Sequence, residues 1–251
     1  MKRKNLIVKR KADIKYFLAK NSKIKKFYNK FKKIILNNIN NNSFAIAVSG
    51  GSDSLCLAYF SKLYSLEHKN KMHVLIVDHN LRKESKSESI KVRNLLRKKE
   101  IKSIILKWDG KTPKSNIQKN ARNIRYGLIS KYCLKYKINY LITAHHLDDQ
   151  IENFFIRLFR GSGLTGLSSM TESSNSNNHL KIIRPFLNLK KKDLQYVTLN
   201  IFDQYIYDPS NDNDKFLRVR VRKYRKEMEK EGLDTSKIIK TVNNLLSANK
   251  A

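Results

Sequence analysis

The segment Ser49-Gly-Gly-Ser-Asp-Ser54 follows a short apolar run and precedes a helical pattern. Two successive glycines permit a tight turn that brings bare backbone N–H groups close to an anion. The helix expected to begin near Asp53 adds unpaired N–H groups and the positive end of its dipole. The segment therefore predicts a strand–loop–helix site for nucleotide phosphates, formed by Ser49, Gly50, Gly51, Ser52, Asp53 and Ser54.

Asp53 places a carboxylate inside this predicted anion site. Such a charge is unfavourable unless a cation lies between carboxylate and phosphate, and hard oxygen ligands favour Mg²⁺. The loop lacks the Gly-Lys-Ser/Thr ending of the common P-loop NTPases, so it indicates a different class of nucleotide site. A plain Ser/Gly turn with a helix cap is the alternative, and it accounts for two of these residues rather than for all of them.

The chain is strongly basic. Its 251 residues suffice for one good-sized domain and an appendage, and they include 53 Lys and Arg against 21 Asp and Glu, a formal net charge of +32. Such a field attracts polyanions, and nucleic acid is the expected partner. Lys, Asn and Ile are all abundant, as AT-biased coding would produce. Such a coding bias is a second explanation of the positive net charge.

No apolar stretch approaches the roughly 18 residues needed to cross a bilayer, and we expect neither a membrane span nor a secretory leader. The two cysteines, Cys56 and Cys133, occupy apolar positions of helical patterns and form no Cys-x-x-Cys pair. We expect a cytoplasmic protein, with an organelle of bacterial descent as the alternative.

Short apolar runs alternate with helical patterns along most of the chain. Strands are expected at 44–48, 74–77, 103–106 and 140–143, followed by helices at 54–66, 84–99, 116–136 and 148–159. This alternation predicts an α/β fold, a parallel sheet with helices on both faces. We expect a basic N-terminal extension and lead-in helix (1–43), a nucleotide-binding domain (44–170) and a basic, mostly helical C-terminal part (171–251). Within the last part, residues 171–179 are rich in Ser and Asn and are expected to form a loop.

In such sheets, ligands bind beyond the carboxyl ends of the strands. The polar motifs follow these ends, so we expect one crevice to be lined by Ser49–Ser54, Asp78–Arg82, Trp108–Asp109 and His145–Asp149.

A second group of polar residues, His145-His-Leu-Asp148-Asp149-Gln-Ile-Glu152, opens the helix after the fourth expected strand. Its carboxylates and imidazoles suit three tasks: holding a metal, holding an ammonium group, or moving protons. Magnesium binding by Asp148 stays open on this spacing. N-capping by Asp148 is the structural alternative, and it explains one carboxylate rather than the whole group.

These motifs resemble a known family. Residues 49–54 resemble the PP-loop of the N-type ATP pyrophosphatases, which split ATP into AMP and pyrophosphate. Residues 143–152, followed by Arg160-Gly-Ser-Gly163, are similar to the tRNA(Ile)-lysidine synthases in particular. Segments matching in the same order are 77–82, 121–126, 184–187 and 208–211. The chain departs from the family at Asn153, where Thr is usual, and at 218–222, which reads Arg-Val-Arg-Val-Arg in place of an Arg-Asn-Arg-like pattern.

The resemblance implies that the wobble cytidine of a tRNA(Ile) with a CAU anticodon is converted to lysidine, using ATP, Mg²⁺ and L-lysine. An adenylated cytidine is the implied intermediate, and AMP and pyrophosphate are the products. Larger family members carry C-terminal domains that grip the tRNA. Only about twenty-five residues follow the matching region here, so we expect a short form in which the basic residues 1–20 are the candidate substitute.

The resemblance also implies individual roles. The loop would hold the ATP β- and γ-phosphates with Asp53 as metal ligand, and Asp78 and His79 would lie at the adenine. Asp149 and Glu152 are the candidates for binding the lysine amines, and His145 or Asp148 for accepting the proton. Arg122 suits a carboxylate or the AMP phosphate, because its planar fork binds such groups bidentately.

Contacts to the tRNA backbone are expected from Arg157, Arg160, Arg184 and the arginines of 218–225, and base stacking from Tyr126 or Phe159. Two alternatives remain: a PP-loop tRNA thiolase, which needs reactive cysteines, and a non-catalytic basic RNA-binding protein. The sequence leaves the oligomeric state open, with a homodimer as one alternative.

Overall fold

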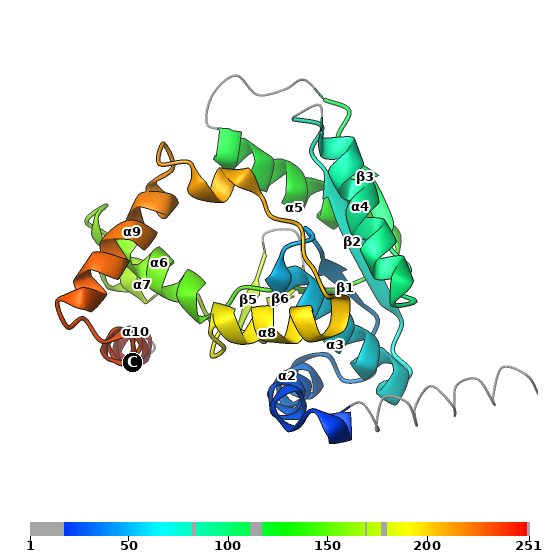
Figure 1. Cartoon of the computed structure of the whole chain (residues 1–251), viewed down its shortest axis with the longest axis horizontal. Coiled ribbons are helices and arrows are strands. Elements are labelled where there is room, and N and C mark those ends of the chain that lie inside the picture. Colours follow the sequence, from blue (N-terminus) through cyan, green and yellow to red (C-terminus); the bar gives the residue numbers. More distant parts are fainter. Residues whose placement is uncertain (1–17, 82–83, 111–116, 169, 177–179, 250–251) are drawn as a thin grey trace, which may run out of the picture.

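The computed structural model describes residues 18–81, 84–110, 117–168, 170–176 and 180–249 (Figure 1). Over these residues the centre of the molecule is a six-stranded sheet in the order β3-β2-β1-β4-β6-β5. The strands are β1 (Phe44–Ala47), β2 (Met72–Asp78), β3 (Ile104–Lys107), β4 (Tyr140–Ile142), β5 (Ser173–Asn175) and β6 (Lys181–Ile183). The pairings β1–β2, β2–β3, β1–β4 and β4–β6 are parallel, which confirms the expected α/β class.

Helices cover both faces of this sheet (Figure 1). α3 and α4 pack on one face and α5 on the other, while α2 and α8 lie against α3. The bounds are α2 (Ser22–Ile39), α3 (Ser52–His68), α4 (Ser85–Lys98), α5 (Ile117–Lys135), α6 (Leu147–Leu158), α7 (Leu164–Leu167), α8 (Lys191–Phe202), α9 (Leu217–Lys230), α10 (Thr235–Ala248) and the 3₁₀ helix η1 (Pro209–Asp212). None of the described helices is long and apolar enough to span a bilayer.

The segment 171–179, expected as a loop, contains strand β5, so that expectation was wrong for residues 173–175. β5 pairs antiparallel with β6 and lies at the end of the strand order. A strand with a neighbour on one side only tolerates a polar Ser-Ser-Asn sequence, and it therefore lacks the apolar run that marks the central strands. The sheet consequently continues past residue 170.

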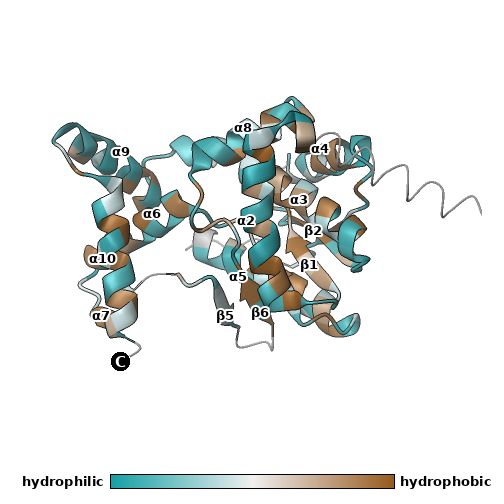
Figure 2. Cartoon of the chain, turned by 90° about the horizontal axis from the view of Figure 1, so that it is seen from below, coloured by the Kyte–Doolittle hydropathy of each residue, from teal (hydrophilic) through white to brown (hydrophobic). Residues whose placement is uncertain are grey.

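The main hydrophobic core lies between the sheet and the α2–α3–α8 layer. Phe31 of α2 is fully buried, and its ring centroid lies 5.7 Å from that of Phe60 and 5.8 Å from that of Phe186. The buried face of α2 alternates with a lysine-rich exposed face, as the hydropathy colouring in Figure 2 shows. The lead-in helix is therefore part of the folded core.

A separate cluster joins α6, α9 and α10. Ile151 and Phe155 of α6 pack with Val221 of α9 and Val242 of α10. Figure 1 shows these helices, with α7, gathered at one side of the sheet. α6 begins shortly after the carboxyl end of β4, and His146, which directly precedes α6, forms an isolated parallel bridge with Phe186. This cluster therefore lies at the carboxyl ends of the strands.

Replacing Phe31 by Ala is expected to lower the free energy of unfolding by about 3–5 kcal/mol, the usual cost of removing a buried aromatic ring. Urea denaturation would measure the change. Lys30→Ala, on the exposed face of the same helix, is the matched control and should change stability by less than about 0.5 kcal/mol. Equal effects of the two substitutions would contradict the placement of α2 in the core.

Candidate active site

The predicted phosphate loop joins β1 to α3. Gly50 has φ +93°, and a Cβ built there would lie 2.6 Å from Val92 Cγ2 of α4 and 3.2 Å from Ile206 Cδ1. Both the backbone conformation and the close neighbours therefore require glycine at this position. Val92 of α4 and Ile206 therefore restrict the conformation of the loop from two sides.

Ser54 holds the loop in its turn. Its Oγ accepts hydrogen bonds from the N–H of Ser49 (3.2 Å) and Gly50 (3.1 Å) and donates to the carbonyl of Gly51 (3.0 Å). Ser52 Oγ donates to the Asp53 carboxylate at 3.1 Å. The serines of the loop thus bond to the loop itself in this structure, and their contact with phosphate stays a prediction.

A segment that sequence reasoning did not connect to the loop crosses it. We call residues 203–208, between α8 and η1, the strap. The backbone N–H of Ile206 in the strap donates to the carbonyl of Gly50 at 2.9 Å, and Thr198 Oγ1 of α8 donates to the carbonyl of Ser52 at 2.6 Å. No local pattern signals these bonds, because the partners lie about 150 residues apart in sequence.

The polar group of residues 145–152 contacts the phosphate loop through His146. From the sequence we expected this residue to line the crevice but assigned it no individual role. This side chain is buried, and its Nε2 lies 3.5 Å from Asp53 Oδ2 and 3.5 Å from Asp149 Oδ2. His146 is also the N-cap of α6: its Nδ1 accepts from the Asp149 N–H (3.3 Å), and the Asp149 carboxylate accepts from the His146 N–H (3.0 Å). The alternative of N-capping by Asp148 was therefore wrong.

Charge at His146 follows from these neighbours. Burial by itself lowers the pKa of His146, but the hydrogen bond to Asp53 and the charge of Asp149 outweigh it and raise that pKa above its ordinary value. Desolvation by itself raises the pKa of the half-buried Asp149, but the charges of His146 and Arg218 outweigh it and hold that pKa below its usual range. Asp53, His146 and Asp149 therefore form one electrostatic unit that links the loop to α6.

The carboxylates of α6 are paired with arginines of α9. Glu152 accepts from Arg222 Nε at 2.5 Å and from Arg218 Nε at 2.5 Å, and Arg218 also binds Asp149. Asp148 accepts from Arg225 (2.8 Å) and from the backbone N–H of Lys191 (2.8 Å). In this structure Arg218, Arg222 and Arg225 thus neutralise the site carboxylates, whereas we expected them at the tRNA backbone.

His145 lies beside this unit. Its Nδ1 is 2.8 Å from Thr143 Oγ1, which orients the ring. Burial, followed by the charges of Arg184, Arg122 and Arg218, outweighs Asp149 and lowers the pKa of His145 to about 4. The imidazole is therefore neutral at physiological pH.

At the end of β2, Asp78 is buried, and its Oδ1 accepts from the Asn80 N–H at 3.0 Å and from Ser85 Oγ. Its backbone carbonyl accepts from the Trp108 N–H at 2.9 Å. Burial and then the Arg125 charge lower the pKa of His79 to about 4. The Asp78 side chain thus fixes the turn at this strand end, and the adenine contact stays a prediction.

The remaining candidates divide into exposed and buried residues. Arg122 is exposed, and its guanidinium carbon lies 5.0 Å from the ring centroid of Tyr126, which packs against the α5 core. Arg184 is buried and donates to the carbonyl of Thr171 (2.9 Å), so contact with a tRNA backbone is not its role in this structure. Arg157 donates to the carbonyl of Gly166.

The other two residues of this group, Arg160 and Phe159, are exposed at the end of α6.

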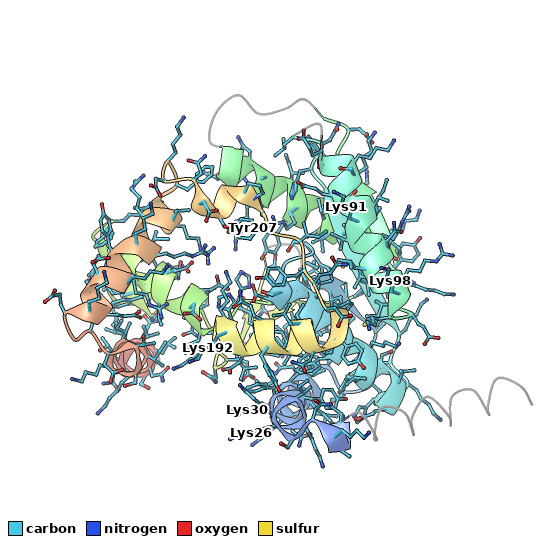
Figure 3. All side chains as sticks on the ribbon, in the orientation of Figure 1. Lys26, Lys30, Lys91, Lys98, Lys192 and Tyr207 are labelled. Atoms are coloured by element: carbon cyan, nitrogen blue, oxygen red, sulfur yellow. The ribbon has the colours of Figure 1, made fainter. Side chains whose placement is uncertain are left out.

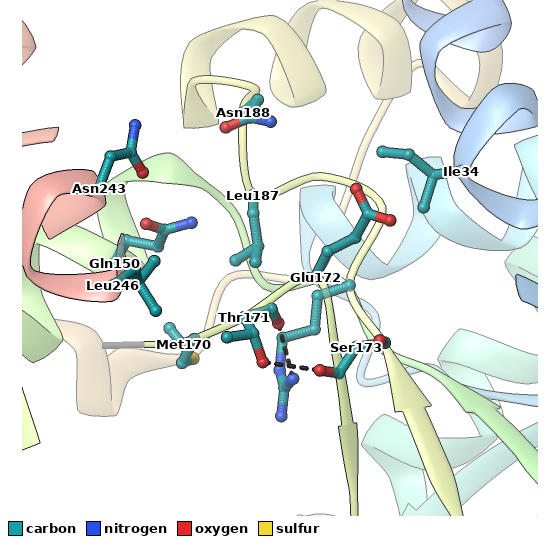
Figure 4. Close-up of a pocket in the computed structure, with 11 residues that line it drawn as sticks. Ile34, Gln150, Met170, Thr171, Glu172, Ser173, Leu187, Asn188, Asn243 and Leu246 are labelled. Carbon is teal, nitrogen blue, oxygen red and sulfur yellow. Dashed lines mark hydrogen bonds between the residues drawn. The ribbon is translucent and has the colours of Figure 1, made fainter. Parts of the chain in front are cut away.

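A polar hollow of about 380 Å³ lies between the edge of the sheet and α10 (Figure 4). Gln150, Asn188 and Asn243 are among the residues that line it, together with Glu172 and Arg184. No residue of the phosphate loop lines it, so among the described residues it is distinct from the predicted nucleotide site. No group of three or more His, Cys, Asp or Glu side chains within the described chain is arranged to hold a metal.

A glycine turn held between a parallel strand and a helix N-terminus defines an α/β nucleotide-binding protein. The sequence profile of the PP-loop domain matches residues 19–227. The chain therefore belongs to the PP-loop family, as its loop motif predicts.

Curated relatives confirm the expected resemblance to tRNA(Ile)-lysidine synthases. The enzyme so named from Orientia tsutsugamushi is 44% identical over 188 residues, covering 75% of this chain and 42% of that protein. Those of Rickettsia akari and Rickettsia prowazekii are 40% and 37% identical over 198 and 223 residues, covering 78% and 84% of this chain and 46% and 51% of theirs. The chain thus spans about half the length of these relatives or less.

Among solved structures, the U34-tRNA thiolase NcsA of Methanococcus maripaludis, determined with its [4Fe-4S] cluster, aligns with a TM-score of 0.74 at 19% identity, covering 91% of this chain and 81% of that one. The NMN synthetase of Francisella tularensis aligns with a TM-score of 0.51 at 13% identity, covering 90% and 92%. These similarities support the fold alone.

Asp53→Asn is expected to lower the pKa of His146, because it removes the charge that stabilises the imidazolium. NMR titration of the imidazole nitrogens would measure the shift. Because the pKa is raised in the folded state, the stabilisation is fully present below the unfolded pKa of about 6.5 and is lost as pH rises through the folded value. The stability difference between wild type and variant should therefore be largest in mildly acidic solution.

The matched control is Asp109→Asn, which removes an exposed carboxylate paired with Lys107 at 2.7 Å. It should leave the His146 titration unchanged. An unchanged His146 titration in Asp53→Asn would show that the two side chains do not interact.

Proposed function

We propose that the protein ligates L-lysine to C2 of the wobble cytidine of a tRNA(Ile) with a CAU anticodon, using ATP. The observation that carries the proposal is the contact between His146 and Asp53. It brings the phosphate loop and the carboxylate-rich start of α6 into one site, so that a nucleotide and an amine can meet there. The names of the curated relatives support the same reaction.

Two displacements make up this chemistry. The O2 oxygen of cytosine attacks the α-phosphorus of ATP and pyrophosphate leaves. The lysine ε-amine then attacks C2, the C2–O bond breaks, and AMP departs with the oxygen. Adenylation is needed because the carbonyl oxygen of cytosine is a poor leaving group, whereas AMP is a good one.

The loop residues fit the phosphates of ATP. The backbone N–H groups at the start of α3 face the loop, and the helix dipole favours an anion there. Asp53 offers carboxylate oxygen beside the hydroxyl of Ser52, a donor set suited to Mg²⁺ that arrives on the nucleotide. Such a cation would balance phosphate charge during pyrophosphate release.

The amine must lose a proton before it attacks. Deprotonating lysine at pH 7 costs about 4.6 kcal/mol from its reference pKa near 10.4. Both candidate bases have a lowered pKa, so basicity does not rank one above the other. Asp148 already accepts from Arg225 and from the backbone N–H of Lys191. His145 is neutral, and its ring is oriented by Thr143.

Lysine itself would bind at the α6–α9 boundary. Asp149 and Glu152 offer carboxylates for its amino groups, while Arg218, which bridges both, has a side chain that is 41% exposed. An accessible guanidinium is suited to the α-carboxylate of an amino acid. When lysine binds, its amino and carboxylate groups would then replace existing ion-pair partners of Asp149, Glu152 and Arg218.

A thiolase is less favoured by the cysteines. Both are buried, burial raises the pKa of Cys56 well above its ordinary value, and it raises that of Cys133 to about 11. Thiols of this kind are poor nucleophiles.

Incubation with ATP, Mg²⁺, lysine and a CAU-anticodon tRNA(Ile) transcript is expected to add a lysine-sized mass to the wobble cytidine, detected by mass spectrometry. Asp53→Ala should reduce the product by at least about 10²-fold, the usual scale for losing one group that stabilises developing charge. An adenylated cytidine without lysine would contradict the lysine site. Binding of tRNA without modification would favour the non-catalytic RNA-binding alternative.

Cys56→Ala combined with Cys133→Ala is expected to leave lysine transfer within about twofold of wild type, once folding is checked by circular dichroism. Loss of activity in a folded double variant would favour sulfur transfer over ligation of lysine.

A further inference from the structure

The strap carries an exposed aromatic residue beside the phosphate loop. Tyr207 is 55% exposed, although its neighbours Tyr205 and Ile206 pack against the main core. Figure 3 shows Tyr207 on the segment that passes between α8 and η1. Single exposed tyrosines are common, so its surroundings must decide whether it has a task.

A backbone hydrogen bond holds the strap to the phosphate loop. Immediately before Tyr207, the N–H of Ile206 donates to Gly50 of the phosphate loop at 2.9 Å. Beyond it, Asp212 of η1 acts on the Tyr207 hydroxyl and raises the pKa of that hydroxyl. The backbone directly before Tyr207 is therefore held to the loop, while the side chain of Tyr207 is more than half exposed.

Charges of the site also reach Tyr207. Arg222, which binds Glu152 at 2.5 Å, is close enough to act on the Tyr207 hydroxyl. Asp208, the next residue, interacts with Arg125, whose charge acts on His79 at the end of β2. Tyr207 thus lies in the strap beside the phosphate loop, within electrostatic reach of Arg222.

We propose that Tyr207 forms a stacking site for a nucleobase at the mouth of the active site. This inference rests on the proposed function, because it assumes an RNA substrate and ATP. A solvent-exposed ring next to a cationic side chain is an arrangement on which unstacked bases bind. A base of the tRNA anticodon loop and the adenine of ATP share this chemistry, and the openness of the ring favours the tRNA base.

The test compares Tyr207→Leu, which removes the ring, with Tyr207→Phe, which keeps it. Tyr224→Leu is the matched control, since Tyr224 is a 53% exposed tyrosine on α9. For each protein, KM is measured separately for tRNA and for ATP, together with equilibrium binding of tRNA. Tyr207→Leu should raise KM and Kd for tRNA about 5- to 150-fold, the range that corresponds to about 1–3 kcal/mol of stacking. Tyr207→Phe and Tyr224→Leu should stay near wild type.

The outcomes distinguish a tRNA base from adenine as the stacked ligand, and they test the stacking site separately from the proposed reaction. A rise confined to KM for ATP would support the stacking site and assign it to adenine. Equal losses in Tyr207→Leu and Tyr207→Phe, equal losses in Tyr207→Leu and Tyr224→Leu, or no change at all would overturn it. If the wild type forms no lysidine, the proposed reaction fails, while the tRNA-binding comparison still tests the ring.

Discussion

The approach of His146 Nε2 to Asp53 Oδ2, at 3.5 Å, joins two parts of the molecule that the sequence keeps about ninety residues apart. One partner lies in the first turn of α3, directly after the phosphate loop, and the other caps α6. The parallel sheet makes this contact possible because β1 and β4 are neighbours and end at the same edge. Everything proposed about chemistry depends on this shared edge.

Charge balance at the site depends on α9. Three carboxylates on one helical turn would repel one another and lose solvation, yet Arg218, Arg222 and Arg225 offset both effects. The same contacts align α9 with α6 above the apolar cluster of Ile151 and Val221. The packing of α9 against α6 and the neutralisation of the site carboxylates therefore depend on the same contacts.

Prediction from sequence succeeded where the signal is local. The alternation of apolar runs and helical patterns predicted the parallel sheet, and the expected strand at 44–48 and helix at 54–66 lie within about two residues of β1 and α3. It failed at β5, whose polar residues form a strand only because β6 offers a partner. It also passed over His146 in favour of His145, since two adjacent imidazoles cannot be ranked before their surroundings are known.

The sequence by itself determined the phosphate loop, because the conformation of Gly50 and the N–H groups of a helix start are properties of adjacent residues. It also determined the class of fold, through short-range periodicity. Only the tertiary structure decided which groups meet the carboxylates of α6, and that the strap presents Tyr207 beside the loop. Those partners lie dozens of residues away in the chain, and their contacts arise from packing, which leaves no local pattern to recognise.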